Sequence, residues 1–503
     1  MLSRDPIEPR QQALAEWRQL DGDATAIVRE VCPVQQGRGG QSVERAGEGR
    51  LCDAEPGRNG DHRLTLIGGQ RTQYAPLVDG GRLGVEGDRQ FAGQRPLNGC
   101  QQVHHGSNRD SWHLGSRDHD ASIVTSCILV GVSPLDVLRP SLEVLVDGPS
   151  DDVLRLGLLI PMSGPLGLTA TSALDAACLA AMEVNESGGE RGRPVELVLV
   201  DAGSDPQRVA AESRYLADAK LVDAFVGLHN SDVHRAIEAA LAGRTPYIFT
   251  PPHEGGHRSP GVVLIGDPPS RQIGPALTTL MSRRRLRRWV MVGSDYIWTW
   301  SMHRFAAKQI VAAGGSVVSS RLVPFGLHAA DADELVDLLS RRHADAVLLS
   351  LIGSDLAVFN RAFARAGLGD RVVRLSGSLE ENGLLAAGGD DTGELYSAMR
   401  SFAGQADDRR RALAENHHRA FGDFAPVLDA YSEGCYDGVH LAVALAAIDA
   451  LAAAPAQSAA RHLLAQNGVD CPDAWSHAPV GAPQQHRCLA RADGLDFAVV
   501  ADL

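Results

Sequence analysis

Lysine is almost absent from this chain of 503 residues, which has two lysines against 46 arginines. Neither Lys220 nor Lys308 follows a glycine or precedes a serine or threonine. The chain therefore has no P-loop, whose lysine reaches the phosphates of a nucleotide. The formal net charge of −14 also argues against direct nucleic-acid binding, which needs clustered positive charge. We interpret the arginine run at residues 283–288 as the cationic C-terminal end of a helix.

Motifs for catalysis and for metal binding are also missing. The sequence has no G-x-S-x-G elbow, no H-E-x-x-H helix and no G-x-G-x-x-G fingerprint. Its eight cysteines include no C-x-x-C pair. Cys178 and Cys435 fall in apolar helical stretches and are expected to be small core residues, whereas Cys471 and Cys488 could form a disulfide in an exported protein. We therefore expect no enzyme, no cofactor and no metal site.

The first 145 residues lack any sustained apolar period. The opening MLSRDPIEPRQQ is charged and has no apolar segment of a secretory signal. We expect residues 1–145 to be a largely disordered extension, or translation to start downstream near Val144 or Val146. The chain as given is then expected to be cytoplasmic, without membrane insertion; a different start leaves an exported or cell-envelope protein as the alternative.

From residue 152 onward, short apolar runs alternate with helical stretches. This alternation predicts right-handed crossovers and parallel sheets covered on both faces. Because about 350 residues exceed one doubly wound sheet, we predict an α/β fold of two Rossmann-like lobes joined by a hinge. The expected lobes are 152–267 with 401–470, and 268–400 with 471–503. The predicted strands are 154–160, 195–200, 224–227, 247–249, 289–292, 317–322, 346–351 and 372–375.

Polar side chains follow four of these strands. Ligands of open α/β sheets bind beyond the carboxyl ends of the strands, so the residues there are candidates for hydrogen bonds to a small polar solute. Structural explanations compete: a serine can cap a helix, a threonine can bond its own loop, and Trp298 is expected to pack. The candidate ligand-binding residues are Asn230, Ser231, Thr250, Pro251, Tyr296, Ser378 and Glu380.

Three sequence runs carry a resemblance to a known family: GLHNSDVHRAIEAAL at 227–241, TPYIFTPPHEGGHRSP at 245–260 and VMVGSDYIWTW at 290–300. Together they resemble the type I periplasmic-binding-protein family, and within it the amide- and urea-binding branch. The resemblance covers about residues 152–450. It implies that Ser231, the Thr250–Pro251 turn and Tyr296 contact the ligand.

The resemblance implies a non-enzymatic solute-binding protein with one of two roles. In the first, the chain is a ligand sensor that closes on a short-chain amide or urea and regulates a partner protein. In the second, it is the substrate-binding component of an ABC transporter and delivers urea, amides or branched-chain amino acids to a permease. An amino acid would need an acidic partner for its ammonium group, which Glu380 could supply. The sequence does not decide whether the chain forms a homodimer.

Overall fold

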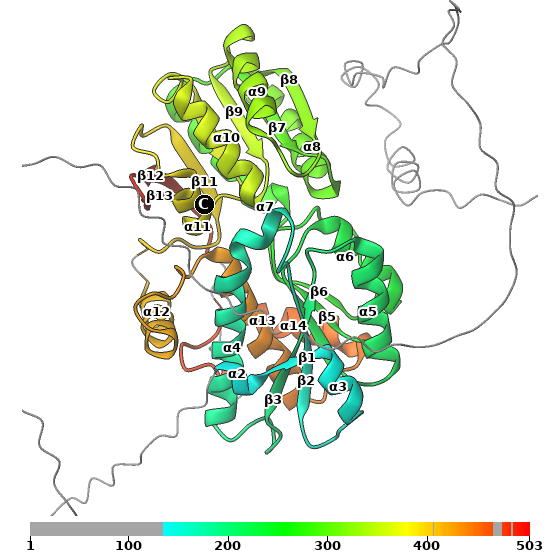
Figure 1. Cartoon of the computed structure of the whole chain (residues 1–503). Coiled ribbons are helices and arrows are strands. Elements are labelled where there is room, and N and C mark those ends of the chain that lie inside the picture. Colours follow the sequence, from blue (N-terminus) through cyan, green and yellow to red (C-terminus); the bar gives the residue numbers. More distant parts are fainter. Residues whose placement is uncertain (1–133, 406, 466–474, 484–485) are drawn as a thin grey trace, which may run out of the picture. The chain divides into compact units, whose positions relative to one another are not determined.

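The structure is a computed structural model that describes residues 134–405, 407–465, 475–483 and 486–503. All of the described residues belong to one compact unit. Residues 1–133 of the expected extension 1–145 lie outside the described residues, as does Cys471, the expected partner of Cys488. The unit contains two sheets, each of which forms a lobe with the helices packed on it (Figure 1).

The first lobe is built on a six-stranded sheet in the order β1-β3-β2-β4-β5-β6, in which every neighbouring pair is parallel. All seven residues of the central strand β2 are buried, which explains why its sequence LRLGLLI is a nearly continuous apolar run. The elements of this lobe are α2 (Pro134–Val137), β1 (Leu138–Pro140), α3 (Ser141–Asp147), β2 (Leu154–Ile160), η1 (Pro165–Thr169), α4 (Ala170–Glu186), β3 (Val195–Asp201), α5 (Pro206–Asp218), β4 (Ala224–Gly227), α6 (Ser231–Leu241), β5 (Tyr247–Phe249), β6 (Val262–Leu264), α12 (Asp408–Phe421), α13 (Ala430–Ala447) and α14 (Ala453–Ala465).

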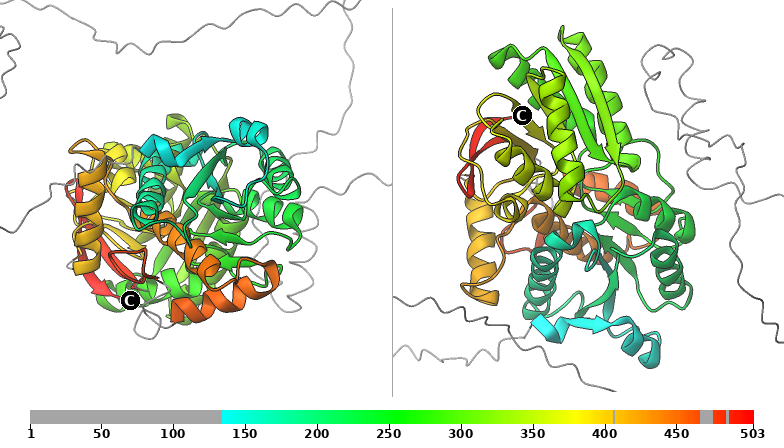
Figure 2. Two further views of the ribbon diagram at one scale, coloured as in Figure 1. Left: turned by 90° about the horizontal axis from the view of Figure 1, so that it is seen from below. Right: turned by 45° about the horizontal axis from the view of Figure 1, so that its top comes forward.

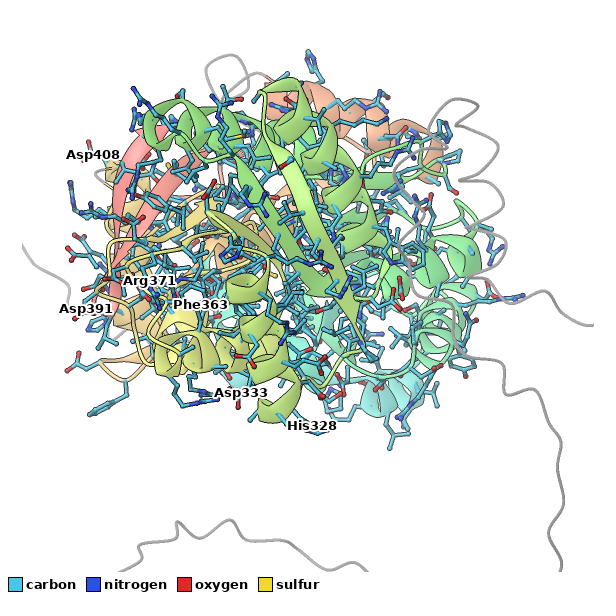
Figure 3. The ribbon with its side chains drawn as sticks, turned by 90° about the horizontal axis from the view of Figure 1, so that it is seen from above. His328, Asp333, Phe363, Arg371, Asp391 and Asp408 are labelled. Atoms are coloured by element: carbon cyan, nitrogen blue, oxygen red, sulfur yellow. The ribbon has the colours of Figure 1, made fainter. Side chains whose placement is uncertain are left out.

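The second lobe is built on a seven-stranded sheet in the order β13-β12-β11-β10-β9-β7-β8. Its strands are parallel except at β12, which runs antiparallel to both neighbours. Figure 3 shows this lobe from above with its side chains; the labelled Phe363 of α10 is fully buried, and the Arg374 guanidinium lies 4.3 Å from its ring centroid. The elements are α7 (Pro269–Arg284), β7 (Arg288–Ser294), α8 (Ile297–Ala312), β8 (Ser316–Val323), α9 (Ala329–Arg341), β9 (Ala346–Ser350), α10 (Gly353–Arg365), β10 (Val373–Ser376), α11 (Glu381–Ala387), β11 (Leu395–Met399), β12 (Cys488–Asp493) and β13 (Asp496–Asp502).

The chain passes between the lobes three times: between β6 and α7, between β11 and α12, and between α14 and β12. The views in Figure 2 show the C-terminal hairpin β12–β13, in red, beside the strands of the second lobe. Arg487 joins the first and third crossings, because its guanidinium donates two hydrogen bonds of 2.7 Å to the Asp267 carboxylate. The two-lobed α/β fold with parallel sheets, predicted from the alternation, is confirmed.

Folded structure begins upstream of the boundary expected at residue 145. Strand β1 pairs in parallel with β3, and the side chains of Val137 and Val144 are buried. Arg139 of β1 also donates a 2.9 Å hydrogen bond to Glu196 of β3. Thus β1 and the start of α3 precede both Val144 and Val146, and they are part of the first lobe.

Core assignments made from the sequence agree with the burial of the side chains. Cys178 and Cys435 are buried in the first lobe. The stretch Pro165–Glu186 is long and apolar enough to cross a membrane, but most of it is buried in the protein core. Asp205 caps α5 by accepting hydrogen bonds from the amides of Gln207 and Arg208, with Pro206 as the first helical residue; both residue types are favoured at these positions.

Candidate functional site

A small cavity lies where the loops at the carboxyl ends of the strands meet, and both lobes contribute to its wall. Its volume is about 20 Å³, which is room for roughly one water molecule. A larger solute can enter only when the lining residues move apart. The described lining consists of Leu166, Leu228, His229, Asn230, Ser231, Pro251, Pro252, Tyr296, Trp298, Ile352, Ser378 and Tyr431.

The first-lobe wall is centred on the N-terminus of α6. Asn230, not Ser231, is the N-cap, because its side-chain oxygen accepts a 2.9 Å hydrogen bond from the Val233 amide. Ser231 is the first helical residue and is 2% exposed, and its hydroxyl has no hydrogen-bond partner among the described residues. The expectation that Ser231 caps the helix is therefore corrected. A buried hydroxyl without a partner is costly, and at the edge of a cavity it is available to a solute.

The second-lobe wall is formed by the aromatic residues after β7. Tyr296 precedes α8 and is 5% exposed, and burial raises the pKa of its phenol well above the ordinary value, so the hydroxyl stays protonated. Trp298 also lines the cavity, and its buried indole Nε1 has no hydrogen-bond partner among the described residues. From the sequence, Trp298 was expected to pack against its neighbours without contacting a ligand. Its position two residues after Tyr296, at the start of a helix that follows a strand end, could have identified it as part of the site.

Ser378 and Tyr431 are in contact at the cavity wall. Ser378 lines the cavity, but its hydroxyl already donates a 2.7 Å hydrogen bond to the Leu351 carbonyl. The Tyr431 hydroxyl donates to the Ser378 carbonyl at 3.4 Å. Tyr431 was not predicted, because it lies in the first turn of helix α13 and does not follow a strand.

Two of the predicted site residues do not line the cavity. Thr250 is buried, and its hydroxyl donates to the Gly227 carbonyl at 3.1 Å; the neighbouring Pro251 does line the cavity. Glu380 caps α11, where its carboxyl group accepts hydrogen bonds from the amides of Asn382 and Gly383 at 2.6 and 2.9 Å. Burial raises the pKa of Glu380 well above its ordinary value. The structure therefore gives Glu380 a capping role and places no acidic side chain in the described lining.

The lobes are joined beside the cavity by hydrogen bonds from α8. The Ile297 amide donates to the Asp232 carboxylate at 3.3 Å, and the Ser301 hydroxyl donates to the Glu254 carbonyl at 3.0 Å. Asp232 follows Ser231 in the first turn of α6, and Glu254 lies in the first-lobe loop that carries Pro251. These contacts position α6 and this loop against α8 of the other lobe, so separating the lobes would open the cavity.

The lining combines mainly apolar side chains with a few polar, uncharged ones. None of the twelve lining residues that the structure describes is Asp, Glu, Lys or Arg. Aromatic rings and prolines form the walls, and Ser231 and Trp298 offer one hydroxyl and one indole N–H without partners. Within the described residues, no group of three or more His, Cys, Asp or Glu side chains is arranged to hold a metal ion.

Comparisons with known proteins identify the same architecture. Residues 153–477 match the model of a family described as periplasmic binding protein. A solute-binding protein of an ABC transporter from R. palustris, solved with benzoate, is 17% identical with a TM-score of 0.56, over 70% of this chain and 96% of that one. A leucine-binding protein from Thermotoga maritima is 15% identical with a TM-score of 0.58, over 70% and 99%. A fatty acid ABC transporter substrate-binding protein from Thermomonospora curvata is 20% identical with a TM-score of 0.58, over 70% and 93%.

Proposed function

The chain belongs to the periplasmic-binding-protein family, and from this we propose that it is a non-enzymatic solute-binding protein that closes its two lobes on a small uncharged polar molecule. The observation that carries the proposal is the cavity itself. Ser231 of one lobe and Trp298 of the other line it, and the Ser231 hydroxyl and the Trp298 indole nitrogen are buried without a hydrogen-bond partner among the described residues. A solute that bonds to both stabilises the closed arrangement over any other.

The absence of charged side chains from the described lining favours a neutral solute. The ammonium group of an amino acid would need an acidic partner, and Glu380, the expected one, instead caps α11. A carboxylate would be buried without a cation beside it, which is costly. A short-chain amide or urea needs only hydrogen bonds. Its carbonyl oxygen can accept from Ser231 and Trp298, which supports the amide and urea ligands that the sequence motifs implied.

Delivery of this solute to an ABC permease is the role that two of the named structures support, because they are described as a solute-binding and a substrate-binding protein of ABC transporters. A sensor that regulates a partner protein is the alternative, and it rests on the motif resemblance. Gene neighbours separate the two: a permease and an ATPase support delivery, and an RNA-binding antiterminator supports the sensor.

A thermal-shift screen tests the ligand class. We expect acetamide, propionamide or urea to raise the melting temperature of residues 134–503, since a ligand that binds only the folded state stabilises it in proportion to the logarithm of its concentration. Leucine and benzoate serve as matched charged solutes and are expected to have no effect. Stabilisation by leucine or benzoate, with none by the uncharged solutes, would overturn the proposed ligand class.

A further inference from the structure

A chain of side-chain hydrogen bonds runs through the interior of the first lobe to the cavity wall. The Arg258 Nε donates to His234 Nε2 at 3.0 Å. The other ring nitrogen of His234 lies 3.1 Å from the Tyr247 hydroxyl, which lies 2.8 Å from Nε2 of His229. Nδ1 of His229 lies 3.1 Å from the Asn230 carbonyl oxygen. All of these side chains except Asn230 are nearly or fully buried.

Arg258 sets the direction of every bond in this chain. A guanidinium only donates, so His234 Nε2 must accept and carry no proton. The proton of the neutral His234 ring is then on Nδ1, which donates to the Tyr247 oxygen. Tyr247 in turn donates its hydroxyl proton to His229 Nε2. The proton of the neutral His229 ring is therefore on Nδ1, from which it is donated to the Asn230 carbonyl.

The last carbonyl in the chain belongs to the N-cap of α6. It also accepts the His234 amide at 3.0 Å, so one peptide group receives hydrogen bonds from both histidines at the start of the helix that carries Ser231. Gly227 makes room for this arrangement, because a Cβ there would lie 2.9 Å from His229 Nε2. The ring of His229 reaches the cavity wall with both of its nitrogens already occupied.

We propose that the two ends of this chain, Arg258, which only donates, and the Asn230 carbonyl, which only accepts, fix both histidines as Nδ1–H tautomers and thereby present His229 to the solute as a neutral wall. This inference rests on the proposed function only in calling the cavity a solute site. The tautomers themselves follow from the hydrogen bonds and require no solute.

The charged groups around the chain support neutral rings. Arg258 donates to Glu254 at 2.8 Å, and Arg235 donates to Glu254 and Glu238 at 2.7 and 3.2 Å. The negative charge of each carboxylate is therefore balanced by an arginine. Glu238 lies 3.8 Å from His234 Nε2, on the side where Arg258 already donates. Burial lowers the pKa of His229 to about 4. For His234, burial is again the main cause of a pKa well below the ordinary value, and Arg258, Arg235 and the neighbouring His229 and His253 lower it further.

The same arginine connects the chain to the contact between the lobes. Glu254, which accepts from Arg258 through its carboxylate, accepts the Ser301 hydroxyl of the second lobe through its carbonyl. Arg258 therefore also holds the loop that contacts the second lobe. Tyr247→Phe breaks the hydrogen-bond chain and leaves the ion pairs of Arg258 intact.

Nitrogen NMR of the histidine side chains, with the full chain uniformly labelled with ¹⁵N, tests the proposal without any solute. Loss of a signal pair in His229→Asn and in His234→Asn assigns the two rings. We expect both rings in the Nδ1–H form in wild type, in place of the Nε2–H form that free histidine prefers, with no change between pH 5.5 and 8. An Nε2–H or protonated His229 in wild type would overturn the proposal.

Two variants then test which end of the chain holds each ring. Tyr247→Phe disconnects the rings, and both should keep the Nδ1–H form, because Arg258 still donates to His234 and the Asn230 carbonyl still accepts from His229. Adding Arg258→Met to Tyr247→Phe should release His234 alone. Retention of the pure Nδ1–H form by His234 in the double variant, or its loss by His229 in either variant, would overturn the proposal.

Discussion

At the scale of single residues, neighbouring side chains at the start of α6 have different tasks. Asn230 satisfies a helix amide, whereas the Ser231 hydroxyl is buried without a partner. The hydrogen bond of Asn230 stabilises the folded protein. The buried Ser231 hydroxyl destabilises it as long as no solute is bound. Residues that bind ligands are expected to be less than optimal for stability.

Alanine substitutions distinguish the two tasks. Asn230→Ala should lower the free energy of unfolding by ~1 kcal/mol, because the helix loses its N-cap. Ser231→Ala should leave it unchanged within a few tenths of a kcal/mol or raise it, because a buried hydroxyl without a partner is removed. Urea unfolding without solute measures both. An equal loss in the two variants would show that Ser231 has a structural partner.

Glu381 provides a test by pH. Burial raises its pKa from 4.5 to about 7, so the folded protein holds a proton that the unfolded chain releases above pH 4.5. Its contribution to stability therefore falls as the pH rises from 4.5 to 7. Glu381→Gln should gain stability relative to wild type over this window, by at most ~3 kcal/mol. Parallel urea-unfolding curves of the two proteins at pH 5 and 7.5 check this, and a constant difference would contradict it.

Which residues form the site was predictable only in part. The rule that ligands bind beyond strand ends led to Asn230, Ser231, Pro251, Tyr296 and Ser378, all of which line the cavity. The rule locates an edge of the sheet and does not say where each side chain points. Residues such as Glu380 and Thr250 turn away because a buried carboxylate or hydroxyl bonds to the nearest free backbone groups.

At the scale of elements, apolar runs bounded by turns predicted the central strands well. The predicted bounds of β2, β4 and β5 match the structure to the residue. Strands β1, β6, β11, β12 and β13 were not predicted. Strand β1 is a three-residue edge strand, too short to show a period. Strands β12 and β13 form an antiparallel hairpin at the edge of the other sheet, outside the alternation of strands and helices on which the prediction was based.

Truncation tests the role of the elements before residue 148. A chain that starts at residue 134 should unfold at the same urea concentration as the full chain, because the sequence of residues 1–133 lacks an apolar period. A chain that starts at residue 148 loses β1 and the buried side chains of Val137 and Val144. Burial of two valines contributes ~3–6 kcal/mol, so its unfolding midpoint should fall clearly. Equal midpoints for the two truncations would show that β1 is dispensable.

At the scale of the whole molecule, the crossings between the lobes are held by an ion pair. Arg487 and Asp267 are 14% and 17% exposed and join the first crossing to the third. We expect Asp267→Asn to lower the free energy of unfolding by ~1–3 kcal/mol, since a charge-assisted hydrogen bond is lost in a partly buried place. Asp218→Asn is the matched control. Its pair with Arg214 is 48% and 61% exposed, and exposed pairs contribute little.

Urea unfolding compares these two variants with wild type. A clear loss in Asp267→Asn with no loss in Asp218→Asn would support a structural clamp at the crossings. The same small effect in both variants would show that the lobes are held together by the packing and the α8 contacts alone.

The central claim is that an uncharged solute binds between the lobes at Ser231 and Trp298. Isothermal titration of acetamide and urea into wild type, Ser231→Ala and Trp298→Phe tests it most directly. We expect saturable binding of one molecule per chain in wild type. Each variant should bind about 5- to 150-fold more weakly, because the solute loses one buried hydrogen bond of ~1–3 kcal/mol. Absence of saturable heat from either solute, or wild-type affinity in both variants, would contradict the account.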